Sequence, residues 1–475
     1  MLNIHEYPKA EKVFSFFEQI SAIPHGSTNT DKIADYLVRF AKERGLFVYR
    51  DAANNVLIRK PASNGRESRP TVILQGHTDM VAQKKPDSPI DMNEEGLTLY
   101  RDGDFLRAKD TTLGGDDGVA VAYELALLDD PNAEHPELEA LFTSDEEIGL
   151  IGADLFDASV LRGKIMLNLD SDNEGVFTVG CAGGIRVDIR LPIRRDTPAK
   201  GAFSLKITGL KGGHSGAEID KGRANAIKLG VELLRAIGKV RPISLTSGSA
   251  DNAIPREFLV VFAREGEDAP AVIEAEIRKL TEKYKASEPD IAVFCESVSC
   301  DEPPMDEASS DAVLDLLDRE PNGVTAMSRE LPGLVETSLN IGILKTEKDT
   351  ACAAIALRSA KDAEKNKLLE KVEKIAHGVG ATTSSWGDYP AWEYHKDSRL
   401  QTLARDLYFR MSGKEATIMA THGGLECGIF SNRIEGLDCI SLGPDNFDIH
   451  TTEEHLSISS TARVYEFLKQ LLKEI

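Results

Sequence analysis

A histidine and an aspartate stand two residues apart where an apolar run ends, in the first third of the chain. Residues 71–80 read TVILQGHTDM, so this run is followed by His77 and Asp79. A continuous apolar run of this kind indicates a strand buried on both faces of a sheet. Side chains at i and i+2 leave a strand on the same face, so both should point into one crevice at the strand end. An imidazole in that position predicts that His77 binds a catalytic metal.

Four further candidate ligands follow other apolar runs or lie in adjoining loops. Carboxylate and imidazole groups bind divalent ions, and a catalytic zinc keeps one coordination position for water. The candidate set is His77, Asp116, Glu147, Asp170 and His450. Five ligands are one too many for a single open site, and they suit two ions that share one carboxylate. Each residue alone has a simpler explanation as a helix cap, a solvated turn or a structural histidine, but their joint placement favours a metal site.

The chain shows two different sequence patterns, and the first of them positions these residues. Near both ends of the chain, apolar runs that end in acid or imidazole alternate with helical segments, as in βαβ units of a parallel sheet. This alternating pattern ends around the glycine-rich stretch 179–184 and resumes after residue 386. We therefore predict an α/β fold. Its catalytic domain, residues 1–184 and 386–475, has a mostly parallel central sheet flanked by helices, and residues 185–385 form an inserted α+β lid domain for substrate binding and dimerisation.

The individual elements are predicted from apolar spacing and from cap and turn residues. Helices are expected over 11–23, 31–45, 224–237, 270–285, 307–318, 361–377, 398–411 and 453–473, with Thr451 or Thr452 as the cap of the last one, and the stretch 111–118 opens a further helix whose apolar residues run from 119 to 128. Strands are expected over 46–50, 55–59, 71–76, 138–143, 164–169, 202–210, 256–263, 291–298, 334–344, 351–358 and 437–442.

Composition limits the classes of partner. The 475 residues carry a formal net charge of −22, which argues against nucleic acid and anionic membrane surfaces as partners. The N-terminus lacks the pattern of a signal peptide, and no window has the apolar length of a membrane span. The six cysteines are scattered without a CxxC motif, which is typical of small buried side chains in a reducing compartment. We expect a cytoplasmic protein with a small-molecule substrate.

The motifs taken together resemble a known family. They are GHTDM at 76–80, LGGDDG at 113–118, DEEIG at 145–149, NLD at 168–170 and the late His450. Over nearly the whole chain the sequence resembles the dizinc metallopeptidases that include aminoacylase, glutamate carboxypeptidase and succinyl-diaminopimelate desuccinylase. Within that group it is most similar to the aminoacyl-histidine dipeptidases, also called Xaa-His dipeptidases or peptidase D. Position 117 is Asp where relatives often have Asn, and HTT replaces the common HSP at 450–452, but neither change removes a ligand.

The resemblance implies how the ligands divide between two metal ions. Asp116 would bridge the ions, His77 and Asp170 would complete one site, and Glu147 and His450 would complete the other. The ions would be zinc, with cobalt or manganese as alternatives. A cis peptide bond after Asp116 is also implied.

The resemblance and the neighbouring residues also suggest catalytic roles. Glu146 would be the general base, which takes a proton from the attacking water and passes it to the leaving amine. Asp79, beside a ligand histidine, would accept the other imidazole N–H and raise the basicity of the ligand. His214, in the motif GGHSG, would stabilise the oxyanion, from its own or from the partner subunit. Without the resemblance, His214 is an incidental histidine in a glycine-rich turn.

Four residues are implied to bind substrate. Asn252 and Arg358 would hold the C-terminal carboxylate, for which the planar guanidinium fork is suited. Gly423 lies in a glycine loop whose backbone would line the substrate pocket, and Glu426 would meet the free amine. The alternative for Arg358 is a surface ion pair.

These expectations define an enzyme and its rivals. The resemblance implies a homodimeric dipeptidase with two divalent metal ions, which hydrolyses Xaa-His dipeptides such as β-alanyl-histidine (carnosine) and other short unblocked dipeptides. The first alternative is an aminoacylase, which removes an N-acyl group from an amino acid. An aminopeptidase for longer peptides and a non-catalytic metal-binding scaffold are further alternatives. The scaffold is disfavoured because no ligand and no base has been lost from the sequence.

Overall fold

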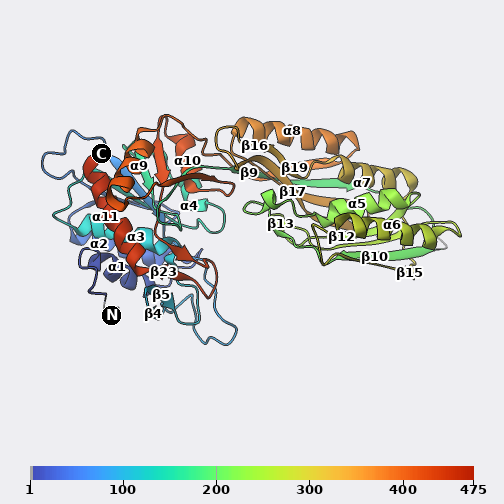
Figure 1. The fold of residues 1–475 in the computed structure, drawn as a ribbon, viewed down its shortest axis with the longest axis horizontal. Coiled ribbons are helices and arrows are strands. Elements are labelled where there is room, and N and C mark those ends of the chain that lie inside the picture. The colour runs from blue at the N-terminus through green and yellow to red at the C-terminus, as the bar shows by residue number, and fades with distance from the viewer. Residues whose placement is uncertain (1–3, 199–200) are drawn as a thin grey trace. The chain divides into compact units, whose positions relative to one another are not determined.

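The computed structural model describes residues 4–198 and 201–475. The chain forms two compact units, and both labelled termini belong to the first (Figure 1). Unit 1 contains the chain up to Cys181 together with 394–420 and 425–475, and unit 2 contains 182–393 and 421–424. Unit 1 is therefore assembled from the two ends of the chain. Within the described residues, no helix is both long enough and apolar enough to cross a membrane.

Unit 1 contains an eight-stranded sheet, a small four-stranded sheet and the helices that cover them. Its elements are α1 (Glu11–Ser21), α2 (Asp31–Glu43), β1 (Phe47–Arg50), β2 (Val56–Lys60), β3 (Val72–His77), β4 (Leu99–Asp102), β5 (Phe105–Ala108), α3 (Gly115–Asp129), β6 (Leu138–Thr143), α4 (Ile151–Leu155), η1 (Ala158–Val160), β7 (Ile165–Asn168), β8 (Val176–Cys181), α9 (Arg399–Ser412), β20 (Thr417–Thr421), α10 (Glu426–Arg433), β21 (Asp438–Ser441), β22 (Asn446–Phe447), β23 (His455–Ser457) and α11 (Ile458–Glu474).

The strand order of the large sheet is β1-β2-β6-β3-β7-β21-β8-β20. The four central strands β6, β3, β7 and β21 run parallel, and the β1, β2 and β8 pairings beside them are antiparallel. All six residues of β3 are buried, as are all six of β6. Burial on both faces is what parallel strands require. The predicted α/β class, with a parallel centre flanked by helices, is confirmed.

Alternate side chains of the central strands enter two different layers, because the side-chain period of a strand is two. On one face Val72 and Leu74 join the main core, which also contains side chains of α1, α2, α3, α9 and α11. On the other face α10 contacts α4, β8 and β21. Helix α3 is buried almost all round and contacts both α1 and β3, so it is the central helix of unit 1.

The small sheet corrects the predicted start of the last helix. Its strand order is β22-β23-β5-β4, and Leu456 of β23 pairs with Leu106 of β5. Helix α11 therefore begins at Ile458, and the Ser457 side chain caps it by accepting the backbone N–H of Ser460. The prediction of Thr451 or Thr452 as the cap is wrong, because the chain first forms a strand.

Unit 2 is an antiparallel sheet with helices. Its elements are β9 (Gly183–Pro192), β10 (Ala202–Thr208), β11 (Gly213–His214), η2 (Ile219–Lys221), α5 (Ala226–Ile237), β12 (Arg241–Ser247), β13 (Ala253–Ile254), β14 (Phe258–Ala263), α6 (Ala269–Tyr284), β15 (Ala292–Val298), α7 (Glu307–Arg319), β16 (Gly323–Met327), β17 (Val335–Glu347), β18 (Thr350–Ser359), α8 (Asp362–Gly378) and β19 (Thr382–Tyr389).

The main sheet of unit 2 has the order β15-β10-β14-β12-β17-β18-β9-β19, and β16 also pairs with β17. Helices α6, α5, α7 and α8 contact one another in that order and also contact the sheet (Figure 1). Strands β9, β12, β16 and β19 were not predicted, nor were the two-residue strands β11 and β13. Strand β19 is a polar edge strand with mostly exposed side chains, so no apolar run marks it.

Candidate metal centre

The five predicted ligands lie around the carboxyl ends of the parallel strands of unit 1. His77 is the last residue of β3, whereas Glu147 and Asp170 follow β6 and β7. Asp116 lies in the first turn of α3, and His450 lies in the loop between β22 and β23. Carboxyl ends of parallel strands meet at one edge of a sheet, so local sequence order is enough to bring the first three together.

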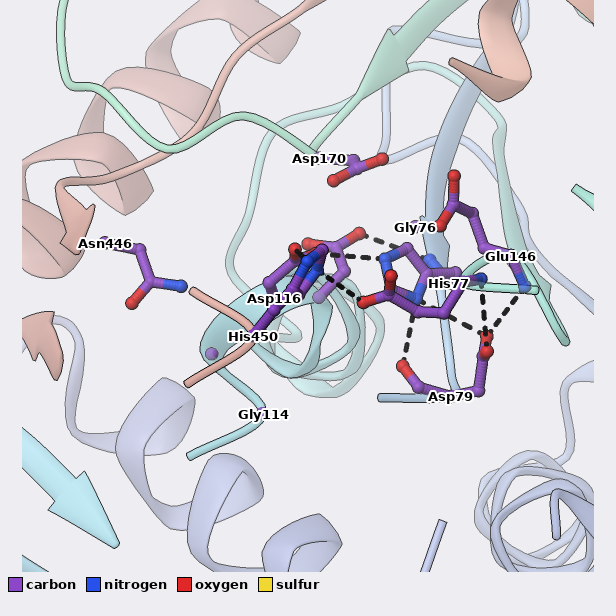
Figure 2. Close-up of polar contacts among 12 residues, drawn as sticks. Gly76, His77, Asp79, Gly114, Asp116, Glu146, Asp170, Asn446 and His450 are labelled. Atoms are coloured by element: carbon purple, nitrogen blue, oxygen red, sulfur yellow. Dashed lines mark hydrogen bonds and ion pairs between the residues drawn. The ribbon is translucent and has the colours of Figure 1, made fainter. Parts of the chain in front are cut away.

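The ligand atoms form overlapping groups. The atoms of His77, Asp116 and Asp170 lie within 4.8 Å of one another, as do those of Asp116, Glu147 and His450. Asp116 belongs to both groups. Its Oδ1 lies 3.0 Å from Nε2 of His77, and its Oδ2 lies 3.1 Å from Nε2 of His450 (Figure 2). His450 Nε2 also lies 3.0 Å from Oε1 of Glu147. The arrangement thus provides two adjacent clusters that share one carboxylate.

Electrostatics of the cluster show a concentration of negative charge around two imidazoles. Burial alone would lower the pKa of His77, but Asp116, Asp79 and Asp170 outweigh it and raise that pKa well above its usual range. Hydrogen bonds to Asp116 and Glu147 raise the pKa of His450 to about 10. Both imidazoles thus lie among carboxylates whose negative charge needs compensation. A divalent ion would supply that positive charge.

Asp170 gives a direct test of whether the cluster suits a metal ion. Within the described chain no side chain donates a hydrogen bond to its carboxylate, which faces the group around Asp116 (Figure 2). Burial, together with the nearby Asp116 carboxylate, raises the pKa of Asp170 to about 7. A buried carboxylate without a donor is costly, and metal coordination removes that cost. The set of two imidazoles and three carboxylates therefore fits divalent ions.

The peptide bond between Asp116 and Asp117 is cis, as the resemblance implied. The Asp117 carboxyl accepts the backbone N–H of His77 at 3.2 Å. Burial raises the pKa of Asp117 well above its usual range. Asp117 therefore holds the backbone of His77 from the residue that follows Asp116.

Asp79 organises the residues around His77. Nδ1 of His77 lies 2.9 Å from the backbone carbonyl oxygen of Asp79 and 3.5 Å from its carboxylate, so the backbone oxygen is the nearer acceptor. The Asp79 carboxylate accepts the backbone N–H groups of Glu146 at 3.0 Å and Glu147 at 3.4 Å (Figure 2). It also accepts the Ser27 hydroxyl at 2.8 Å. Asp79 therefore fixes the backbone of the DEE turn as well as the neighbouring histidine.

Glu146 belongs to a third group of potential ligands, with His77 and Glu147, and not to the two groups that contain Asp116. Its carboxylate comes within 4.8 Å of ligand atoms of His77 and Glu147. Burial is the largest cause that raises the pKa of Glu146 well above its usual range, and the nearby acids add to it. A carboxyl group with such a pKa holds a proton more readily than an exposed one, which suits a group that must accept and return a proton.

One carboxylate oxygen of Glu426 has internal partners, whereas the other, Oε1, is buried without a hydrogen-bond partner among the described residues. Glu426 is fully buried, and its carboxylate accepts hydrogen bonds from Gln75 at 2.5 Å and from Thr143 at 2.6 Å. Gln75 in turn accepts a bond from Asn168 at 2.7 Å, so the network ties α10 to three central strands. This burial speaks against direct contact between Glu426 and a substrate amine.

Two residues of the centre were missed by the sequence analysis. Ser27 binds Asp79, and Glu454 binds the backbone of the loop that carries Asp116. Neither residue follows a central strand, and neither is a metal-ligand candidate by position. A glutamate four residues after a ligand histidine was the only available signal for Glu454.

The predicted substrate residues of the middle segment lie in unit 2. His214 is in β11 and Arg358 is in β18, whereas Asn252 precedes β13. Nδ1 of His214 accepts the backbone N–H groups of Ala217 at 3.1 Å and Gly216 at 3.3 Å. The ring proton must therefore be on Nε2, which is left as a hydrogen-bond donor.

Arg358 belongs to the same region of unit 2 as His214. Its Nη1 donates to the Tyr389 hydroxyl at 3.0 Å, and a Cβ on Gly216 would lie 3.3 Å from the Arg358 guanidinium carbon. Burial, with the Arg358 charge as the second cause, lowers the pKa of His214. Gly423 lies in the short segment 421–424 that belongs to unit 2, and its N–H donates to the Thr421 hydroxyl at 3.1 Å.

His422, in that same segment, is a buried neutral histidine. Its Nε2 lies 2.7 Å from the Ser338 hydroxyl, and its side chain is 7 % exposed. Burial lowers the pKa of His422 to about 4, and the charge of Arg358 contributes. Folding therefore excludes the proton that an unfolded histidine, with a pKa near 6.5, would bind.

Unit 2 is expected to lose stability in mild acid through His422. A depressed pKa gives stability that is present above the unfolded pKa and is lost as the pH falls toward the folded value. Between pH 7 and pH 4.5 the contribution of His422 should fall by roughly 2.5 kcal/mol, read as the difference between the wild type and His422→Gln, because burial raises the pKa of Glu320 to about 8 and that group acts in the opposite direction. Both tryptophans, Trp386 and Trp392, belong to unit 2, so urea unfolding followed by tryptophan fluorescence reports this unit.

The matched variants are His422→Gln and, as control, His377→Gln on the exposed face of α8. His422→Gln should flatten the loss of stability between pH 7 and pH 4.5, because glutamine does not titrate there. The control should follow the wild type. Equal pH dependence in all three proteins would contradict the role of His422.

Comparison with known proteins agrees with the class that the fold and the ligand clusters define. The family model described as peptidase family M20/M25/M40 matches residues 73–474. The cytosol non-specific dipeptidase of Escherichia coli is 36% identical over 474 residues, which cover 98% of each chain. A crystal structure of aminoacylhistidine dipeptidase from Vibrio alginolyticus superposes with a TM-score of 0.90 at 36% identity, covering 98% of this chain and 96% of the other. Aminopeptidase PepT from Bacillus cereus shares the fold, with a TM-score of 0.61 at 17% identity and 98% of each chain covered.

The chain therefore belongs to peptidase family M20/M25/M40. Two of the relatives that it matches over nearly their full length, the Escherichia coli and Vibrio alginolyticus proteins, are named as dipeptidases. The predictions of a metallopeptidase family and of a hydrolase are confirmed. The assignment of individual ligands and catalytic residues stays a prediction.

Proposed function

We propose that this protein is a metal-dependent dipeptidase that hydrolyses unblocked dipeptides, Xaa-His dipeptides such as β-alanyl-histidine among them. The observation that carries the proposal is the pair of ligand groups that share Asp116, with the Glu146 carboxyl beside them. The full-length similarity to an aminoacylhistidine dipeptidase and to a non-specific dipeptidase supports the substrate class. The similarity to a non-specific enzyme argues for a range of dipeptides rather than histidine alone at the second position.

Two divalent ions would be held by the five candidate ligands. His77 and Asp170 would hold one ion, Glu147 and His450 the other, and Asp116 both. Zinc suits this mixture of imidazole and carboxylate, and cobalt or manganese could replace it. When bound, the ions polarise the scissile carbonyl and make water a stronger nucleophile at neutral pH.

Glu146 would manage the proton in this reaction. As general base it removes a proton from the attacking water, and as general acid it delivers that proton to the amine nitrogen of the leaving amino acid. The proton is returned in the same turnover, so the carboxyl group ends as it began. Asp79 would act through the backbone, because its carboxylate holds the N–H of Glu146 and so fixes where the base stands.

Residues of unit 2 would recognise the substrate. His214 would donate its Nε2–H to the oxyanion, and its two backbone partners at Nδ1 support that tautomer. Arg358 and Asn252 would bind the C-terminal carboxylate, and the backbone at Gly423 would line the pocket. Arginine suits this task because its fork binds a carboxylate through two bonds.

A matched set of substrates tests the proposal against its nearest rival, an aminoacylase. The set is alanyl-histidine, β-alanyl-histidine, alanyl-leucine, N-acetyl-alanyl-histidine, N-acetylhistidine and an alanine-containing tetrapeptide. The free dipeptides should exceed the acetylated ones in kcat/KM by about 10–100-fold, since a hydrogen bond to a charged amine is lost on acetylation. Preference for N-acetylhistidine would replace the proposal by the aminoacylase. Efficient cleavage of the tetrapeptide would replace it by an aminopeptidase.

A cytoplasmic location and a homodimer are further parts of the proposal. The Escherichia coli relative is named as a cytosolic enzyme, which supports the location. Sedimentation equilibrium of the full chain, with a mass of 51.8 kDa, would show a dimer as twice that value. A single species at 51.8 kDa would contradict the dimer.

A further inference from the structure

The buried carboxylate of Glu454 accepts hydrogen bonds from the backbone of the loop that carries Asp116. Oε2 of Glu454 accepts the N–H groups of Leu113 at 2.7 Å and Gly114 at 3.0 Å. Oε1 accepts those of Gly115 at 2.8 Å and Asp116 at 3.3 Å. Four consecutive backbone donors therefore converge on one side chain, which belongs to a residue that is only 4 % exposed.

Leu113 and Gly114 precede α3, and the regular part of the helix begins after Asp117, because Asp116 and Asp117 have non-helical backbone angles. The first N–H groups of a helix have no acceptor within the helix. The residue before α3 is Gly114, in the left-handed region at φ 68°, and it has no side chain that could cap. Glu454 supplies the acceptor for these four N–H groups from a position more than three hundred residues later.

The fit around this carboxylate leaves little freedom. A Cβ at Gly115 would come within 2.8 Å of the Asn446 side chain, which itself donates to Glu454 Oε1 at 3.3 Å. A Cβ at Gly114 would come within 2.8 Å of Met80 Sδ. Figure 2 shows Gly114 and Asn446 on the Asp116 side of the centre. Side chains at positions 114 and 115 would thus collide with neighbours that pack against this loop.

The same carboxylate is attached to the loop that carries His450. Glu454 lies four residues after His450, and its N–H donates to the Thr451 carbonyl oxygen at 3.2 Å. His450 itself is 45 % exposed, and its ring contacts Asp116 and Glu147. The backbone on which His450 stands is therefore fixed relative to Asp116 through Glu454.

We infer that Glu454 is a positioning residue of the metal centre, which sets the spacing of Asp116 and His450 by holding both of their loops. Its two oxygens are occupied by N–H groups, so it acts through these ligands and binds no metal itself. The inference rests on the proposed metal centre. It explains how ligands from opposite ends of the chain reach one site.

The test compares Glu454→Gln with Glu453→Gln in the full chain. Glutamine keeps the volume of Glu454 but turns one acceptor into a donor that faces other N–H groups. Glu453 is the neighbouring glutamate, is exposed and pairs with Lys85, so its variant controls for the loss of one negative charge. Co²⁺ binding to the metal-free proteins is measured by calorimetry, and the visible spectrum of bound Co²⁺ reports the coordination geometry.

Glu454→Gln should weaken Co²⁺ binding by about 10–100-fold and change the Co²⁺ spectrum, as expected when a partner that orients ligands is lost. At saturating Co²⁺ its KM for alanyl-histidine should stay within about threefold of the wild type while kcat falls. Glu453→Gln should match the wild type in all four measurements. A merely structural role would lower the unfolding temperature without altering the spectrum or the affinity.

The possible outcomes separate this inference from the proposed function. If the wild type binds no Co²⁺, the proposed metal centre itself fails. If the wild type binds two equivalents and Glu454→Gln binds them equally well with the same spectrum, only the positioning role fails. If Glu454→Gln does not fold, as judged by circular dichroism, Co²⁺ binding to Glu454→Asp is compared with that to Glu453→Asp. The shorter carboxylate at position 454 should also weaken Co²⁺ binding, and equal binding by the two variants would reject the positioning role.

Discussion

Glu146→Ala is expected to lower kcat by about 10²–10⁴-fold, which is the usual contribution of a general acid–base group. The reason is that the Glu146 carboxylate lies beside His77 and Glu147, while neither group that contains Asp116 includes it. Water can still replace the missing base inefficiently, so activity should be low rather than zero. Steady-state kinetics with alanyl-histidine at saturating metal measure the effect.

Metal binding should survive this substitution, and that separates the role of Glu146 from that of the ligands. The two equivalents of Co²⁺ should bind within about threefold of the wild-type affinity, because neither ligand group that contains Asp116 includes Glu146. Asp154→Ala, an exposed carboxylate of α4 in the same unit, is the control and should retain full activity. An unchanged kcat in Glu146→Ala would reject the proposed base, whereas loss of Co²⁺ would make Glu146 a ligand.

The ligand positions could be predicted because the parallel strand topology alone brings the strand ends together at this edge of the sheet. His77, Glu147 and Asp170 each follow a strand of the parallel centre, and the carboxyl ends of adjacent parallel strands must lie together. Apolar runs reveal such strands clearly, since both of their faces are buried. A pattern local in sequence thus becomes a cluster in space.

The supporting groups could not be predicted in the same way. Glu454 accepts hydrogen bonds from a backbone segment that is distant in the sequence, and Ser27 donates one to a distant carboxylate. No local sequence pattern predicts such partners. Glu426 shows the opposite difficulty. The resemblance implied a substrate contact, which stays a prediction, and the structure adds that Gln75 and Thr143 engage one of its carboxylate oxygens.

Elements failed to show in the sequence where side chains carry little apolar signal. Strand β19 is polar and mostly exposed at the edge of its sheet, and its pairing with β9 depends on backbone bonds. The start of α11 was misplaced for a related reason. Three residues before the helix, His455–Ser457, form a strand with β5, and this tertiary pairing overrides the threonines that could have capped the helix.

Asp116→Asn is expected to have the largest effect on the metal centre, because Asp116 is the residue that both ligand groups contain. Asparagine keeps the shape but removes the negative charge and one of the two acceptor oxygens. Both equivalents of Co²⁺ should bind at least about 10²-fold more weakly, and kcat/KM should fall by about 10³-fold or more, since several kcal/mol of stabilisation depend on the ions. Asp102→Asn, an exposed aspartate of β4, is the control.

The variant His450→Ala shows whether the number of ions lost depends on which ligand is removed. His450 belongs to one ligand group only, so its removal should weaken one equivalent of Co²⁺ and leave the other within about threefold of the wild type. Calorimetric titration of the metal-free proteins distinguishes one lost equivalent from two. If Asp116→Asn also retains one tightly bound ion, Asp116 is not shared, and the five side chains would then serve two independent sites. Loss of both ions in Asp116→Asn, with loss of only one in His450→Ala, would instead show that the two sites share Asp116.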